Sequence, residues 1–200
     1  MIVRSLAWVA ATVVGLVVGG FVFHFPGSFG ETSWQPAAII FGAVLGGING
    51  LLVGLLQALA VGSSRASGIR LMLVMGLGIG ASHGLADGAP LAIGLATVVL
   101  VGSAVLTLAF GTVLGLRDRA SLAAIFLAWA AGWLVAVQIA GWLGLPREET
   151  PIGWATEHAV VGLIVGLVWG VATAIVGVPA QLRAPAQASS TATSTRADPI

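Results

Sequence analysis

The sequence predicts an all-α fold, a polytopic membrane bundle of six transmembrane helices. Hydrophobic residues make up 58% of the chain and charged residues 8%, whereas soluble domains carry about 25% charged residues. The mean hydropathy is +1.07. The few charges lie between long apolar stretches, all but one of them long enough to cross a hydrocarbon layer of about 30 Å. We expect a six-helix transmembrane domain over residues 1–179, with helices at about 5–25, 36–61, 69–86, 91–116, 120–145 and 155–178.

Each element has its own justification. The first apolar run exceeds the roughly 7 to 15 residues of a signal-peptide core and lacks an A-x-A-like site, so we interpret it as a membrane span. The second begins at Pro36, a residue favoured at helix starts. The third, 69–86, would reach only about 27 Å, and glycines interrupt it, so it is the weakest helix prediction. Residues 180–200 form a polar Pro/Ala/Ser/Thr tail that we expect to be disordered and cytoplasmic.

The arginines indicate how the bundle is oriented. If the N-terminus is cytoplasmic, only Arg147 lies outside, and all the other arginines lie inside: Arg4, Arg65, Arg70, Arg117, Arg119, Arg183 and Arg196. This bias follows the positive-inside rule and predicts that both termini are cytoplasmic. We expect a multi-pass protein of the plasma (inner) membrane of a bacterium or archaeon.

A glycine stripe marks the second predicted helix. Glycine recurs there at every fourth position, at Gly42, Gly46, Gly50 and Gly54. Asn49 and Gln57 lie on the same face of this helix. An interior glycine costs a helix about 1 kcal/mol in water, but in a bilayer it lets a second helix backbone approach closely. The stripe therefore predicts helix packing, with Asn49 and Gln57 as interhelical hydrogen-bonding groups.

The sixth predicted helix repeats this stripe. Gly162, Gly166 and Gly170 align with the last three glycines of the second helix. The alignment suggests a duplicated helical hairpin, helices 1–2 matched by 5–6; shared Gly/Ala/Val/Leu composition is the alternative explanation. The copies differ at Gly42 versus His158 and at Asn49 versus Val165, which makes these positions the first place to look for function.

Ionisable residues gather near the predicted outer face. This outer polar cluster consists of His24, His83, Asp87, Glu157 and His158. His83 and Asp87 are spaced i and i+4, so a carboxylate could orient an imidazole or share an ion with it. The more specific hypothesis is that the outer polar cluster forms a vestibule that binds a metal ion, a proton-coupled solute or a porphyrin. The alternative is that ionisable groups simply collect at membrane interfaces.

The sequence assigns no metal site or cofactor with any specificity. His83, Asp87 and His158 are the best metal candidates, but no HxxxH or HExxH spacing supports them. The chain contains no cysteine and no tyrosine. Ser82 and His83 are adjacent, and adjacent helical side chains project about 100° apart, so they cannot form a nucleophile and base pair. We expect no enzymatic activity, and the net charge of +1 predicts no nucleic-acid partner.

Several functional classes stay open. The first expectation is a non-catalytic subunit or scaffold of a membrane assembly, with the lipid bilayer and other membrane subunits as partners. The alternatives are a small transporter or substrate-binding component for an ion, metal or small solute, and a haem- or chlorophyll-carrying subunit. The chain length, six helices and small residues Ala7, Ala11 and Gly15 are similar to the substrate-binding components of energy-coupling-factor transporters. A transporter should contain a cavity that reaches the outer polar cluster.

Overall fold

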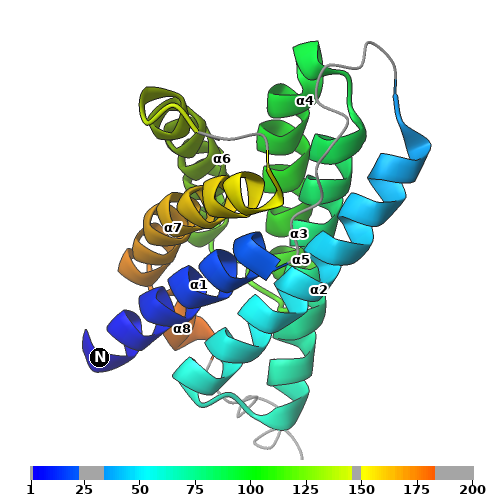
Figure 1. Cartoon of the computed structure of the whole chain (residues 1–200). Helices are drawn as coiled ribbons and strands as arrows, with labels where there is room; N and C mark the ends of the chain where they lie inside the picture. The colour runs from blue at the N-terminus through cyan, green and yellow to red at the C-terminus, as the bar shows by residue number, and fades with distance from the viewer. Residues whose placement is uncertain (1, 23–33, 146–149, 183–200) are drawn as a thin grey trace, which may run out of the picture.

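The structure, a computed structural model, describes residues 2–22, 34–145 and 150–182. These residues are helical, contain no strand and include six helical spans long and apolar enough to cross a membrane (Figure 1). The predicted fold class is therefore confirmed. The elements are α1 (Ile2–Val22), α2 (Pro36–Val61), α3 (Arg65–Gly88), α4 (Leu91–Thr97), η1 (Val98–Gly102), α5 (Ser103–Thr112), α6 (Arg119–Trp142), α7 (Pro151–Ile175) and α8 (Val178–Gln181).

The spans form a closed ring. Each span packs against the next along the chain, with α4, η1 and α5 together making the fourth, and α7 returns to pack against α1. The most extensive contact joins α2 to α3, and the second joins α1 to α7. We call the end of the bundle at which α2, α4 and α7 begin the pocket end. A backbone hydrogen bond from Gln35 N to Gly88 O, 2.9 Å long, ties α2 to α3 there.

The third span is longer than expected and continuous. It begins at Arg65 rather than at residue 69, because Ser64 caps it by accepting a hydrogen bond from Ser67 N at 3.3 Å. Its 24 residues reach about 36 Å, enough to cross a bilayer. The glycines do not break it, because the neighbouring backbone of α2 needs their space: a Cβ at Gly84 would lie 2.7 Å from Ile39 O.

The fourth span is less regular than the single helix expected over 91–116. A π-helical turn, η1, separates α4 from α5, and the helix ends at Thr112. Gly102, the last residue of η1, lies against both neighbouring spans. A Cβ at this position would stand 3.1 Å from both Ser82 Cβ and Trp129 Nε1, so the irregular turn lies in close contact with both α3 and α6.

Two other predicted boundaries move. The sixth span begins at Pro151, four residues earlier than residue 155, because Thr150 Oγ1 caps it by accepting from Gly153 N at 3.1 Å. The predicted start of the tail, residue 180, is too early, because the helix α8 extends to Gln181. Gln181 Nε2 donates a 2.8 Å hydrogen bond to Ser121 Oγ at the start of α6. Residues 183–200 lie outside the described residues.

The glycine stripe of α2 lies against α3 along its whole length. A Cβ at Gly46 would lie 2.6 Å from His83 Cβ, and one at Gly50 would lie 2.7 Å from Gly76 Cα. A Cβ at Gly54 would lie 2.6 Å from Met72 Cα. These separations are too short for any side chain, so the two backbones touch only because glycine occupies the seam.

The stripe of α7 lies against α1 in the same manner. A Cβ at Gly162 would lie 2.7 Å from Leu16 C, and one at Gly166 would lie 2.9 Å from Val13 Cα. The two stripes thus serve different pairs of spans, α2 with α3 and α7 with α1. Duplication of a hairpin stays a prediction.

Aromatic side chains fill the middle of the bundle. The rings of Trp8, Trp169, Trp129 and Trp133 follow one another with centroid separations of 6.3, 6.1 and 6.4 Å. His83 continues the series, 6.1 Å from Trp133. Such tilted and edge-to-face pairs are favourable beyond the area they bury, so the series forms a rigid core that joins α1, α7, α6 and α3.

A buried hydrogen-bond chain runs beside the aromatic series and shares Trp8 with it. Gln57 Nε2 donates to Thr12 Oγ1 at 2.8 Å, and Trp8 Nε1 donates to Thr173 Oγ1 at 3.0 Å. Thr12 Oγ1 in turn donates to Trp8 O at 2.8 Å. The chain links α2, α1 and α7, so Gln57 takes part in the interhelical bonding that its position in the stripe suggested.

The glycine contacts yield a first prediction. Gly50→Ala should destabilise the protein by about 1–3 kcal/mol, because the added methyl group has no room between α2 and α3. Gly47→Ala on the same helix is the matched control, because its Cβ would meet only Gly76 O, at 3.7 Å, and should leave stability unchanged or raise it. Thermal unfolding in mild detergent checks both variants. Equal losses in the two variants would contradict the assigned seam.

The start of α6 yields a second prediction. Asp118 Oδ2 accepts hydrogen bonds from Ser121 Oγ at 2.6 Å and from Ser121 N at 2.8 Å, which hold the pKa of Asp118 below its ordinary value. A depressed carboxyl pKa stabilises the fold above the unfolded-state pKa, and this contribution is lost as pH falls through the folded-state pKa. Asp118→Ala should therefore lower the unfolding temperature at neutral pH, with a difference that disappears in acid. Asp118→Ser, which keeps a cap without a charge, should show a smaller loss at neutral pH, and this loss should also shrink in acid, because the pH-dependent contribution belongs to the wild-type carboxylate.

Candidate functional site

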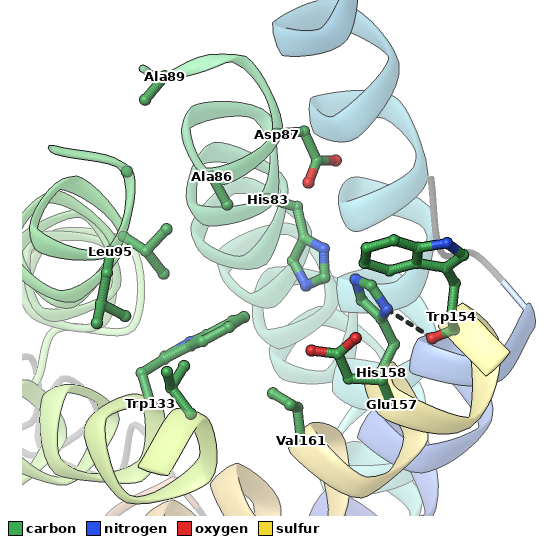
Figure 2. Close-up of a pocket in the computed structure, with 13 residues that line it drawn as sticks. His83, Ala86, Asp87, Ala89, Leu95, Trp133, Trp154, Glu157, His158 and Val161 are labelled. Carbon is green, nitrogen blue, oxygen red and sulfur yellow. Dashed lines mark hydrogen bonds between the residues drawn. The ribbon is translucent and has the colours of Figure 1, made fainter. Parts of the chain in front are cut away.

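A cavity of about 360 Å³ opens at the pocket end of the bundle (Figure 2). It lies between α3, the fourth span, α6 and α7. Its polar and aromatic lining consists of His83, Asp87, Trp133, Trp154, Glu157 and His158, and its remaining lining of Ala86, Ala89, Gly94, Leu95, Val98, Val137 and Val161. Four of the five residues of the predicted outer polar cluster thus line one space. The fifth, His24, lies outside the described residues.

The polar wall of the cavity comes from α3 and α7. Figure 2 shows His83 from α3 pointing toward Glu157 and His158 from α7. His158 Nδ1 donates to Trp154 O at 2.8 Å, one turn earlier on α7. This bond fixes the ring orientation, and in the neutral ring it leaves Nε2 as the acceptor.

Glycines of neighbouring helices make room for this wall. A Cβ at Gly42 would lie 3.0 Å from Asp87 Cγ, and one at Gly46 would meet His83. On the other side, a Cβ at Gly20 of α1 would lie 2.8 Å from His158 C. The pocket-end glycines of α1 and α2 therefore determine where the site residues sit.

Two tryptophans flank the polar wall. Trp133 of α6 meets the His83 ring nearly edge to face, at an interplanar angle of 72°. Trp154 stands in the first turn of α7 and lines the cavity. Indole faces attract cations within about 6 Å, so the pair suits a cationic or polarised ligand group as well as an apolar ring.

Two buried polar atoms of the lining lack hydrogen-bond partners. They are Glu157 Oε2, an acceptor, and Trp133 Nε1, a donor. Burying an unsatisfied polar group costs roughly 1–3 kcal/mol. A bound molecule that carries both a donor and an acceptor would remove that cost, so these atoms point to a ligand with hydrogen-bonding groups.

A small recess of about 20 Å³ continues the cavity toward the bundle centre. Asn49 borders it together with His83 and His158, and Asn49 Oδ1 is buried without a hydrogen-bond partner. The volume is enough for one water molecule, which would need two to four polar partners of this kind. His158, Asn49 and Val165, where the two glycine-striped helices differ in sequence, all line this recess.

The arrangement does not resemble a metal centre. Within residues 2–22, 34–145 and 150–182, no three His, Cys, Asp or Glu side chains are grouped so that they could hold a metal ion. The metal candidates His83, Asp87 and His158 do share the cavity, but they line it rather than converge on one point.

Sequence reasoning missed the wall opposite the polar cluster. It did not single out Leu95, Val98 or Val137, which line this wall. Trp133 and Val137 are spaced i and i+4 on α6, which places them on one face. That spacing was the only available signal, and many apolar helices show it.

The absence of cysteine allows a direct test of how the cavity faces the membrane. Ala86→Cys places the only thiol of the chain in the cavity wall, and Ser82→Cys, one turn away and fully buried, is the matched control. We expect a membrane-impermeant maleimide to label Ala86→Cys on intact cells and to leave Ser82→Cys unlabelled. Labelling of Ala86→Cys only after permeabilisation would reverse the predicted orientation.

Comparison with known proteins assigns no relative: no protein-family model, no curated protein and no solved structure matches the chain. Its function is therefore argued from the cavity and the side chains that line it.

Proposed function

We propose that this membrane protein binds a small amphipathic organic molecule in the cavity at the pocket end, as a transporter or substrate-binding component does. The cavity itself is the observation that carries the proposal. Its volume of about 360 Å³ falls within the roughly 300–1,000 Å³ of small-molecule sites, which combine apolar walls with a few placed polar groups.

The lining defines the ligand class. Glu157 Oε2 calls for a hydrogen-bond donor, and the indole faces of Trp133 and Trp154 favour a donor that carries positive charge. The apolar side chains of Leu95, Val98 and Val137 line the rest. A protonated amine on an apolar body satisfies both halves of the cavity.

The case for a scaffold loses its main support. The glycine faces that suggested contacts with other subunits are covered inside the chain, by α3 on α2 and by α1 on α7. A haem- or chlorophyll-carrying subunit stays an untested alternative, and a Soret or Qy band in the purified protein would support it. With the predicted orientation, the pocket end lies at the outer side of the membrane.

Three probes of one shape and different charge test the proposal. Phenethylamine, 2-phenylethanol and phenylacetate share a phenyl ring and a short linker. We expect phenethylamine to raise the unfolding temperature most and phenylacetate least, because the Glu157 carboxylate attracts an ammonium group and repels a carboxylate. A ligand present at a concentration a hundredfold above its Kd stabilises the folded protein by about 2.7 kcal/mol. No shift with any probe, or the largest shift with phenylacetate, would overturn the proposal.

Glu157→Gln keeps the shape of the site and removes its charge. It should weaken phenethylamine binding by about tenfold, the equivalent of about 1.4 kcal/mol, and leave 2-phenylethanol binding nearly unchanged. Asp118→Asn removes a carboxylate far from the cavity and is the matched control. Equal effects of the two variants on phenethylamine binding would remove Glu157 from the site.

A further inference from the structure

The apolar wall of the cavity is also part of the lipid-facing surface. Leu95 of α4 and Val137 of α6 line the cavity, yet their side chains are 39% and 41% exposed. Both residues lie in candidate membrane spans, Ile93–Thr112 and Arg119–Trp142, where the exposed surface that does not face the cavity faces acyl chains. The cavity lining is thus continuous with the lipid-facing surface at these two residues.

The packing of the fourth span explains this opening. α6 packs against η1 and α5 but makes no comparable contact with α4, and α7 likewise makes none with α4. Figure 1 shows α4 and α6 standing apart at the pocket end. We call the opening between Leu95 and Val137 the lateral mouth.

The lateral mouth and the polar wall lie on opposite sides of the cavity. His83, Glu157 and His158 come from α3 and α7, whereas Leu95, Val98 and Val137 come from the fourth span and α6. A molecule that entered between α4 and α6 would meet polar groups with its leading end and leave its apolar end among lipid chains.

On the basis of the proposed function, we infer that the ligand is a single-chain amphiphile with a hydrogen-bond-donating head, and that it enters from the lipid phase through the lateral mouth. The head lies between Glu157 and the two histidines, and the alkyl chain passes between Leu95 and Val137 into the bilayer. The bilayer favours this route, because each added methylene raises the concentration of such a molecule in the membrane.

Competition in lipid nanodiscs tests the inference. Radiolabelled phenethylamine, short enough to lie wholly inside the cavity, reports on the polar wall, and unlabelled dodecylamine competes for it. Leu95→Trp narrows the lateral mouth and should raise the dodecylamine concentration needed for displacement by about tenfold, a change in binding readily resolved. Because Leu95 also lines the cavity, the phenethylamine affinity of each variant is measured first, and the dodecylamine shift is expressed relative to it. Leu108→Trp, a lipid-facing position of the same span that does not line the cavity, should change neither.

The outcomes separate this inference from the proposed function. If wild-type protein does not bind phenethylamine, the cavity is not the site and both ideas fail. If phenethylamine binds but dodecylamine does not displace it, or if Leu95→Trp and Leu108→Trp shift dodecylamine equally, the lateral mouth is not the entry route. Displacement by dodecanoate at the same concentration as by dodecylamine would overturn the donor head.

Discussion

The close approach of α2 to α3 is the contact on which the rest of the structure depends. Glycine along the seam lets the two backbones touch, and at the pocket end the same glycines leave room for Asp87 and His83. Helix association in lipid relies on such contacts, because apolar surface gains nothing by leaving an apolar solvent. Packing and binding are therefore not separate properties of this chain. The residues that hold the bundle together also place the polar wall of its cavity.

The cavity joins a rigid side to a loosely packed side. The polar wall is backed by the aromatic series that runs from Trp8 through Trp169 and Trp129 to Trp133, with His83 at its end. The opposite wall includes α4, which is only seven residues long and has few neighbours at that end. An interior packed as densely as the aromatic core has low compressibility, so it transmits strain and does not absorb it. Adaptation to ligands of different shape would therefore fall to α4.

Much of this architecture could be predicted from the sequence, for reasons that differ between elements. The spans are predictable because a bilayer demands long apolar helices, and the polar cluster because ionisable groups are rare enough in such a chain to stand out. The continuity of α3 could not be predicted, because its glycines weaken a helix by propensity and are compensated only by contact with α2. The place of Leu95 and Val137 in the cavity wall could not be predicted either, because apolar residues that face lipid and apolar residues that line a cavity look identical in sequence.

The π-helical turn has a consequence for how this protein could change over time. A π turn holds one residue more than the α-helical turn it replaces, and each residue of an α-helix corresponds to about 100° of rotation. The extra residue is contained within the turn, so deleting one residue within Val98–Gly102 would restore regular helix and leave α4 and α5 facing as they do now. A single codon loss at this place would thus keep the set of α4 side chains that line the cavity. The turn marks a point in the fourth span where the length of the chain can change by one residue while the flanking helices keep their orientation.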